Sequence, residues 1–160
     1  DLAHSYLPHL GVQSLRRGIY VQPGRYILGA DVVTLANAAS IEWNLHSCEE
    51  FSQFGGGQVL NFRIGAGSNG PTAFVSFSSE KVTWKTGLTE FVPAYPNSGE
   101  RDRVLCISCE NKNALILWCI CMSGNPPELQ FLTGNRATWK FPDGTAADFD
   151  GTWISLRGTS

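Results

Sequence analysis

The feature that most constrains this chain is an alternation of apolar and polar residues with a period of two. Within residues 40–45, Ile41, Trp43 and Leu45 are apolar, and the residues between them are polar. Successive side chains of a β-strand point to opposite faces, so this pattern gives a strand one apolar and one polar face. Residues 59–64 show a similar two-sided pattern, and no segment carries the i, i+3, i+4, i+7 stripe of an amphipathic helix. The alternation predicts an all-β protein.

The composition agrees with a domain made of many short strands. The 160 residues include 17 glycines and 8 prolines, whereas charged residues account for only 16%. Glycine and proline favour tight turns, and a chain of this length can bury a substantial core as one domain. The apolar runs between turn residues number about ten. We therefore expect a single all-β domain built as a sandwich.

Three segments are expected to differ from this strand pattern. Residues 1–18 carry two histidines and an Arg-Arg pair and are expected to form an N-terminal arm, with the domain covering 19–160. Residues 47–54 are the one expected helical turn, with Ser47 as its N-cap and Glu50 as the second half of a capping box. Residues 136–151 are expected to be mostly loop.

The charge balance and the length of the apolar runs argue against nucleic acids and membranes as partners. The chain has 12 basic and 14 acidic residues, so no basic surface indicates nucleic acid. No run approaches the roughly 18 apolar residues of a membrane-spanning helix, and we expect no direct membrane insertion. The sequence opens on Asp1 without an initiator methionine, and we interpret it as a domain of a longer protein.

Residues 105–121, "LCISCENKNALILWCIC", hold four of the five cysteines. If Asn111-Lys112 is the turn of a hairpin, Cys106 shares a face with Cys119 and Cys121, and Cys109 points to the opposite face. Three thiols on a flat sheet do not surround a tetrahedral zinc ion, and no histidine lies nearby in the sequence. We expect mostly free, buried thiols in a central hairpin, with a metal site, a disulfide or catalysis as less favoured alternatives.

No group of residues has the spacing of a catalytic site. The chain lacks a G-x-S-x-G elbow, and its glycine-rich segments do not lead into helices that could cradle a phosphate. Asp143, Asp148 and Asp150 suggest calcium, but their spacing does not match an EF-hand, and aspartate is common in turns. We expect a binding protein without a cofactor or a metal, and not an enzyme.

The stretch "NRATWKFPD" has the residue types that hold a sugar. Aromatic rings pack against the apolar faces of sugars, and planar polar groups give directional hydrogen bonds. Arg136, Trp139, Lys140, Phe141 and Asp143 supply both kinds of group next to a turn. The alternative is that the Trp and the Phe are core residues, and the local pattern does not separate the two.

Two stretches of the chain resemble the head domain of the rotavirus outer-capsid spike. Residues 114–158 follow that family's order of a strand, a short turn, a strand, an R-A-T motif, a polar loop and a final strand. Residues 77–91, "FSSEKVTWKTGLTEF", match its polar turn followed by a strand with Trp-Lys. The resemblance is good over about 60 residues and weaker over most of 19–160. The five cysteines are unlike the common group A heads, so a group C-like member fits better.

This resemblance implies a galectin-like fold of two facing antiparallel sheets and a lectin on the virion surface. Its partners would be host-cell glycans and the rest of the spike protein, and its location the outer capsid. The family binds glycans at the cleft between its sheets. By the resemblance, Trp139, Lys140 and Phe141 fall where the family has glycan contacts, and Tyr95 falls near a cleft tyrosine.

One departure from the family affects the choice of glycan. The arginine of sialic-acid-binding members would fall near Gly57 or Gln58, and neither is basic. A neutral or blood-group-type glycan is therefore favoured over sialic acid. Two alternatives stay open: a cellular galectin-type lectin, although residues 60–66 lack the galectin histidine and arginine pattern, and a protruding capsid domain with a structural or protein-receptor role.

Overall fold

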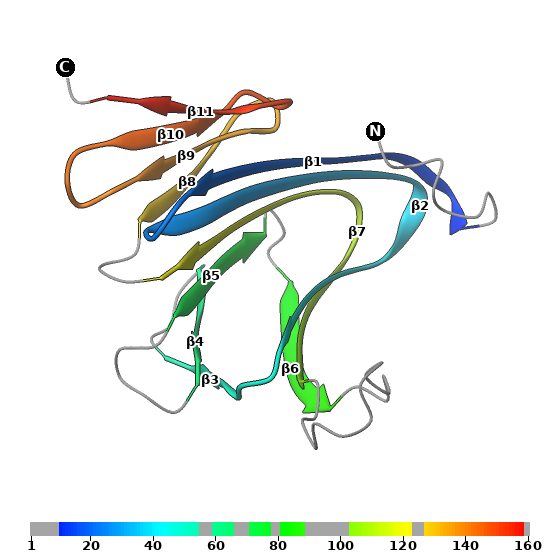
Figure 1. The fold of residues 1–160 in the computed structure, drawn as a ribbon. Coiled ribbons are helices and arrows are strands. Elements are labelled where there is room, and N and C mark those ends of the chain that lie inside the picture. Colours follow the sequence, from blue (N-terminus) through cyan, green and yellow to red (C-terminus); the bar gives the residue numbers. More distant parts are fainter. Residues whose placement is uncertain are drawn as a thin grey trace.

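The computed structural model confirms an all-β fold made of two antiparallel sheets (Figure 1). Its described residues form eleven strands, close to the expected number. The structure describes residues 10–54, 59–65, 71–77, 81–88, 103–122 and 127–158.

The larger sheet, sheet A, has seven strands in the order β1-β2-β7-β5-β4-β3, with β6 paired to β7. Its strands are β1 (Val12–Gln22), β2 (Tyr26–Ser47), β3 (Phe51–Gln53), β4 (Leu60–Ile64), β5 (Thr72–Phe77), β6 (Val82–Leu88) and β7 (Arg103–Cys121).

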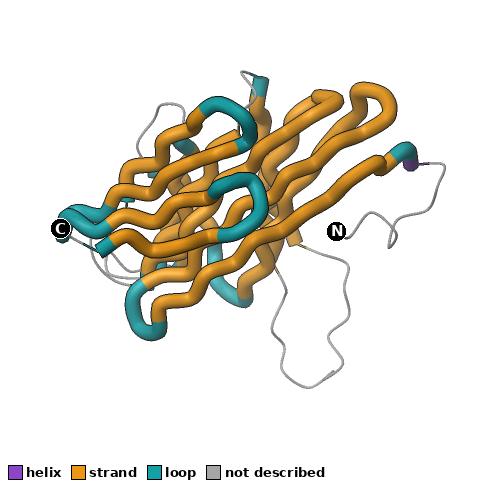
Figure 2. Tube along the Cα trace, turned by 90° about the horizontal axis from the view of Figure 1, so that it is seen from above, coloured by secondary structure: helices purple, strands orange, loops and turns teal. Residues whose placement is uncertain are grey.

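The smaller sheet, sheet B, has the order β11-β10-β9-β8. Its strands are β8 (Glu128–Leu132), β9 (Arg136–Lys140), β10 (Ala146–Phe149) and β11 (Ile154–Arg157). Seen from above, the strands of this sheet and the β1–β2 ribbon run in a similar direction (Figure 2). The expectation that 136–151 is mostly loop is wrong, because two four- to five-residue strands flank a short turn there.

Two long strands, β2 and β7, bend together through the middle of sheet A (Figure 1). Their pairing is regular on either side of a break, where the four residues between Thr34 and Ala39 lie opposite Lys112 alone. We call Tyr26–Thr34 the proximal limb of β2 and Ala39–Ser47 its distal limb. The proximal limb pairs with β1, and β7 pairs with β5 beside this limb and with β6 beside the distal limb.

The hairpin expected at Asn111-Lys112 is therefore wrong, since β7 runs continuously through both residues. The polar sequence at 110–113 marks a solvent-exposed bend and not a chain reversal. The unequal residue count across the break is a bulge, which bends a strand without ending it. It also changes which residues of β7 face the inside of the bend, from Ile107 and Cys109 before it to Ile116 and Trp118 after it.

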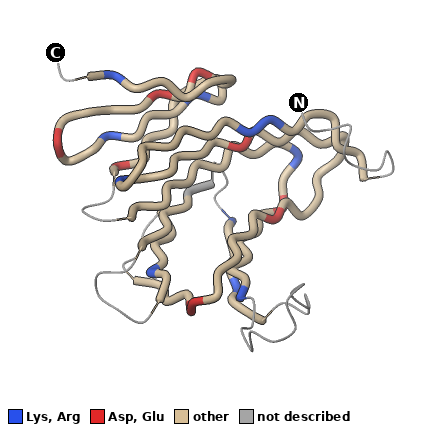
Figure 3. Tube along the Cα trace, in the orientation of Figure 1, with Lys and Arg blue, Asp and Glu red and all other residues tan. Residues whose placement is uncertain are grey.

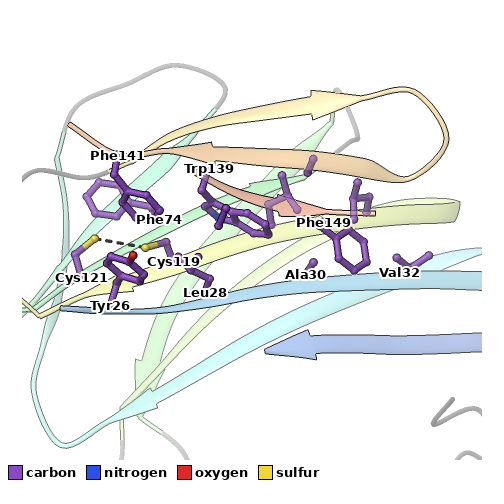
Figure 4. Packing of buried hydrophobic residues seen from close by; sticks show 14 residues of the cluster. Tyr26, Leu28, Ala30, Val32, Phe74, Cys119, Cys121, Trp139, Phe141 and Phe149 are labelled. Carbon is purple, nitrogen blue, oxygen red and sulfur yellow. Dashed lines mark hydrogen bonds between the residues drawn. The ribbon is translucent and has the colours of Figure 1, made fainter. Parts of the chain in front are cut away.

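The bend creates two separate cores. The inter-sheet core lies between sheet B and the proximal half of sheet A and includes Trp139 and Phe149 from sheet B (Figure 4). The bend core lies inside the curve of sheet A and includes Trp43, Phe62 and Leu105. Alternation along the strands sends one apolar set into each core, which is why the proximal parts of β2 and β7 are buried on both faces.

The cysteines belong to this packing. All five lie within the described residues and are free thiols, and four are buried. Cys119 and Cys121 share the inter-sheet face, with their sulfurs 3.4 Å apart (Figure 4). Cys109 lies in the bend core, and Cys106, three residues earlier, points to the opposite face, as the alternation predicts.

Two further expectations are wrong. The helical turn at 47–54 is a bend followed by β3, in which the Ser47 hydroxyl accepts a hydrogen bond from the Glu49 backbone N–H at 2.9 Å. Ser47 therefore stabilises a turn and caps no helix. The arm expected over 1–18 is also too long, because Val12 already opens β1 and this strand pairs with β2. Residues 1–9 lie outside the described residues.

Candidate functional site

The two aromatic residues expected to contact a glycan are buried. Trp139 has no exposed surface, and Phe141 stacks on Tyr26 with ring centroids 4.3 Å apart (Figure 4). Both belong to the inter-sheet core. The expectation that their side chains bind sugar is therefore wrong, and the alternative that they are core residues is confirmed. The reason is the register of β9, which turns Ala137 and Trp139 inward opposite Ala147 and its neighbours.

The same alternation places Arg136 and Lys140 on the outside of sheet B, where both are exposed. This face is separated from the buried aromatic rings by the thickness of the sheet. Tyr95, Gly57 and Gln58 lie outside the described residues.

Asp143 lies in the turn between β9 and β10 and joins the two sheets. Its carboxylate accepts a hydrogen bond from Arg25 at 2.7 Å, and Arg25 belongs to the turn between β1 and β2. The hydroxyl and the backbone N–H of Thr145 also donate to it, at 2.6 and 3.0 Å. These bonds, led by the Thr145 hydroxyl, lower the pKa of Asp143 to about 2. These three hydrogen bonds hold the turn against Arg25 of the β1–β2 turn, so we assign Asp143 a structural role.

A shallow depression lies on sheet B on the side of Arg136. It has a volume of about 500 Å³ and is lined by Leu132, Arg136, Ala137, Thr138, Asp148, Phe149, Asp150 and Arg157. Acidic and basic residues gather on this sheet at the top of the molecule (Figure 3). Thr138 of β9 lies directly opposite Asp148 of β10, so their side chains share the outer face of sheet B. The strand register thus brings polar side chains of neighbouring strands together on this face.

Asp148 is the centre of a hydrogen-bonded network in this depression. One carboxylate oxygen accepts from the Thr138 hydroxyl at 2.7 Å and from Arg157 Nη2 at 2.9 Å. The other oxygen pairs with Arg157 Nε. A bidentate Arg–carboxylate pair has fixed geometry, so the polar groups of the depression are held in place before any ligand arrives.

The turn after β10 presents the most exposed aromatic ring of the described residues. Asp150 accepts hydrogen bonds from the backbone N–H groups of Thr152 and Trp153, both at 2.8 Å. These bonds, the one from Trp153 first, lower the pKa of Asp150, and the positive charge of Arg136 contributes. Trp153 is 74% exposed. These hydrogen bonds fix the turn, and the indole of Trp153 remains exposed to solvent.

We call the residues of this arrangement the outer-face site: Arg136, Thr138, Asp148, Asp150, Arg157 and Trp153. Of these residues, only Arg136 was predicted from the sequence to contact a glycan. If residues 136–140 form a strand, the alternation of "RATWK" puts Arg136 and Thr138 outward and predicts two of the six residues of the site. Trp153 carried no such signal, because its exposure depends on the turn that Asp150 fixes.

The outer-face site offers both hydrogen-bonding groups and an aromatic ring. It combines two guanidinium groups, two carboxylates, a hydroxyl and an exposed indole. Within the described ranges, no three His, Cys, Asp or Glu side chains are grouped so that they could hold a metal ion. The part of the chain that the structure describes also contains no helix long and apolar enough to cross a membrane.

A scan against models of known protein families gives no match, and a search of curated proteins gives none either.

Proposed function

We propose that this chain is a glycan-binding domain of a viral attachment protein, and that the sugar binds at the outer-face site. The resemblance to rotavirus spike heads supports the class of function. The choice of site rests on the exposed indole of Trp153, whose backbone N–H binds Asp150, a residue that lines the same depression as the Arg157–Asp148 pair. An aromatic ring of this kind can pack on the apolar face of a sugar while planar groups bind its hydroxyls. This location differs from the cleft between the sheets that the family uses.

The charge of the site favours a neutral glycan. Arg157 is paired with Asp148, and the positive charge of Arg136 acts on Asp150. Two positive and two negative side chains therefore balance within the site. A sialic acid carboxylate would have to compete with two carboxylates for the same guanidinium groups, whereas a neutral sugar can donate to the aspartates and accept from the arginines. A blood-group-type neutral glycan fits this arrangement.

The affinity of such a site is weak for a single copy. A shallow sugar site has a dissociation constant of roughly 0.1–10 mM, and several copies on one virion raise the effective affinity. The partners in this proposal are host-cell glycans and the remainder of the spike, and the location is the outer capsid. No catalytic step, cofactor, nucleic acid or membrane insertion belongs to it.

A glycan array probed with multivalent domain tests the proposal. We expect selective signal on a few neutral glycans, loss of that signal in Trp153→Ala and partial retention in Trp153→Phe, which keeps an aromatic face. Trp84→Ala is the matched control, because Trp84 is also exposed (41%) but lies in β6 of sheet A. All variants must keep the wild-type circular dichroism spectrum. Equal signal from the wild type and Trp153→Ala would contradict the site, and no signal from folded wild-type protein would contradict the function.

A second candidate function, binding to a protein, is favoured by one observation. Ile19 and Val21 of β1 are two residues apart, so they share a face of the strand, and both are more than half exposed. Exposed apolar residues that lie together are typical of protein contacts. A capsid role with a protein receptor predicts a blank array and a cell-binding signal that Ile19→Ser removes.

A further inference from the structure

A second cavity lies on the concave side of the bend in β2, away from the outer-face site. Its volume is about 310 Å³. Its walls come from β1 and from both limbs of β2, and most of them are apolar: Val12, Leu15, Val33, Leu35, Ile41 and Trp43. Strand β2 does not reverse at residues 35–38 but curves (Figure 1). Residues of both of its limbs therefore line one cavity. We call it the bend cavity.

One wall of the bend cavity is polar. Asp31 lines the cavity on the proximal limb of β2 and is only 2% exposed, whereas the other acidic residue of the lining, Glu42, lies on the distal limb and is exposed. Its Oδ1 accepts from Arg17 Nε at 2.5 Å, and its Oδ2 accepts from Arg17 Nη2 at 3.0 Å and from Trp118 Nε1 at 3.1 Å. The opposite charges of Arg17 and Asp31 lie directly across from each other on β1 and β2. Both oxygens of this buried carboxylate therefore have hydrogen-bond partners at the cavity wall.

The pairing at this wall determines the kind of molecule that fits. A charged ligand end would lose its hydration against these apolar walls, and the Arg17–Asp31 pair, which is neutral overall, gives neither a carboxylate nor an ammonium group a net attraction that offsets this cost. A hydroxyl group carries no charge to desolvate. A carboxylate oxygen can accept two hydrogen bonds, and Asp31 Oδ1 accepts one from the described side chains, so it can take a second from a hydroxyl. The apolar walls require an apolar body, and 310 Å³ corresponds to roughly ten water molecules.

We propose that the bend cavity binds a small uncharged alcohol, with its aliphatic chain against the apolar walls and its hydroxyl on Asp31. This site is independent of glycan binding at sheet B. The two sites share no lining residue, so a variant of one leaves the residues of the other unchanged. The ligand class is defined by the neutral polar end and the apolar walls, and 1-hexanol is its simplest soluble probe.

The test is a titration of ¹⁵N-labelled domain with 1-hexanol, followed by two-dimensional NMR. We expect saturable shifts of the indole N–H signals of Trp43 and Trp118, with a dissociation constant on the order of 1 mM. Hexanoate and hexylammonium have the same chain and a charged end, and we expect each to bind at least about tenfold more weakly. Equal binding of the three compounds, or no saturable binding of 1-hexanol, would overturn the proposal.

A pair of variants shows whether the probe occupies the cavity. Ala39 is an exposed residue of β2 that lines the bend cavity, so Ala39→Phe fills it from the mouth. Ala38, the residue before it, is also exposed but does not line the cavity, so Ala38→Phe is the matched control. With both variants folded, we expect at least a tenfold loss of 1-hexanol affinity in Ala39→Phe and none in Ala38→Phe. Equal 1-hexanol affinities of the two variants would contradict binding in this cavity. So would a wild-type dimer, detected by sedimentation, that Ala39→Phe abolishes, because a second copy of the chain would then occupy the cavity.

Discussion

Gly29 is the position where the smallest change should have the largest effect on stability. Gly29 of β2 lies opposite Trp118 of β7, and the indole lies directly over the glycine. A Cβ at position 29 would be 1.9 Å from Trp118 Cε2 and 2.0 Å from Cζ2. Carbon atoms do not approach this closely, so the ring must move by more than 1 Å, roughly the difference from an ordinary contact of about 3.5 Å.

The cost of Gly29→Ala has two parts. Overpacking of a buried ring costs about 1–3 kcal/mol. Movement of the ring also breaks the hydrogen bond from Trp118 Nε1 to Asp31, and a hydrogen bond to a buried charged group is worth about 1.5–3 kcal/mol. We therefore expect Gly29→Ala to lower the free energy of unfolding by roughly 3–6 kcal/mol, which is a large part of the 5–15 kcal/mol of a typical domain.

Thermal and urea unfolding measure this change. A loss of 1 kcal/mol lowers the melting temperature of a domain of this size by roughly 2–4 °C, so we expect a drop of at least about 6 °C. Gly87→Ala is the control, because Gly87 is also a strand glycine but a Cβ there would meet nothing within 4 Å. This control should melt at the wild-type temperature or slightly above it. A Gly29→Ala variant that also melts at the wild-type temperature would refute the packing of Trp118 on Gly29.

Three further predictions concern residues of the inter-sheet region and the surface. Trp139→Ala should lower the free energy of unfolding by about 3–5 kcal/mol in urea, and Trp139→Phe by less, because the indole N–H has no hydrogen-bond partner among the described residues. Iodoacetamide should modify Cys48 alone in the native protein and all five thiols in urea, as read by intact mass; the hydrogen bond with Cys121 and burial raise the pKa of Cys119 and add to its protection. The depressed pKa of Asp143 stabilises the fold above the unfolded-state value of about 4, and this contribution is lost as pH falls toward 2. The stability difference between wild type and Asp143→Asn should therefore shrink over that window, and a constant difference would contradict the role of the carboxylate.

The fold class could be predicted because it depends on local alternation. Residues such as Ile41, Trp43 and Leu45 show the period of a strand directly, and the structure places them on one face. The positions of the cysteines on opposite faces follow from the same rule. The bend of β7 could not be predicted in this way. Polar residues at 110–113 indicate a turn equally well whether the chain reverses or only curves, and the choice depends on pairing with the distant β2.

The site was predicted only in part, for a related reason. Arg136 and Trp139 belong to one short motif, but Arg136 is exposed and Trp139 is buried, because β9 turns alternate residues to opposite faces. In a loop, all residues of this motif would be equally accessible, whereas strand β9 turns Ala137 and Trp139 into the inter-sheet core. The exposure of Trp153 depends on the backbone of a turn that Asp150 holds, and the pairing of Asp148 with Arg157 depends on the register of β10 and β11.

The most direct test of the glycan site uses the indole signals of the five tryptophans. The ¹⁵N-labelled domain is titrated with the neutral glycan that gives the strongest array signal. We predict that the Trp153 indole N–H and the backbone signals of Arg136 and Asp150 shift with one common dissociation constant, while the Trp139 indole N–H stays unchanged. A shift of Trp139, or of the residues along the cleft between the sheets, without a shift of Trp153 would contradict binding at the outer face of sheet B.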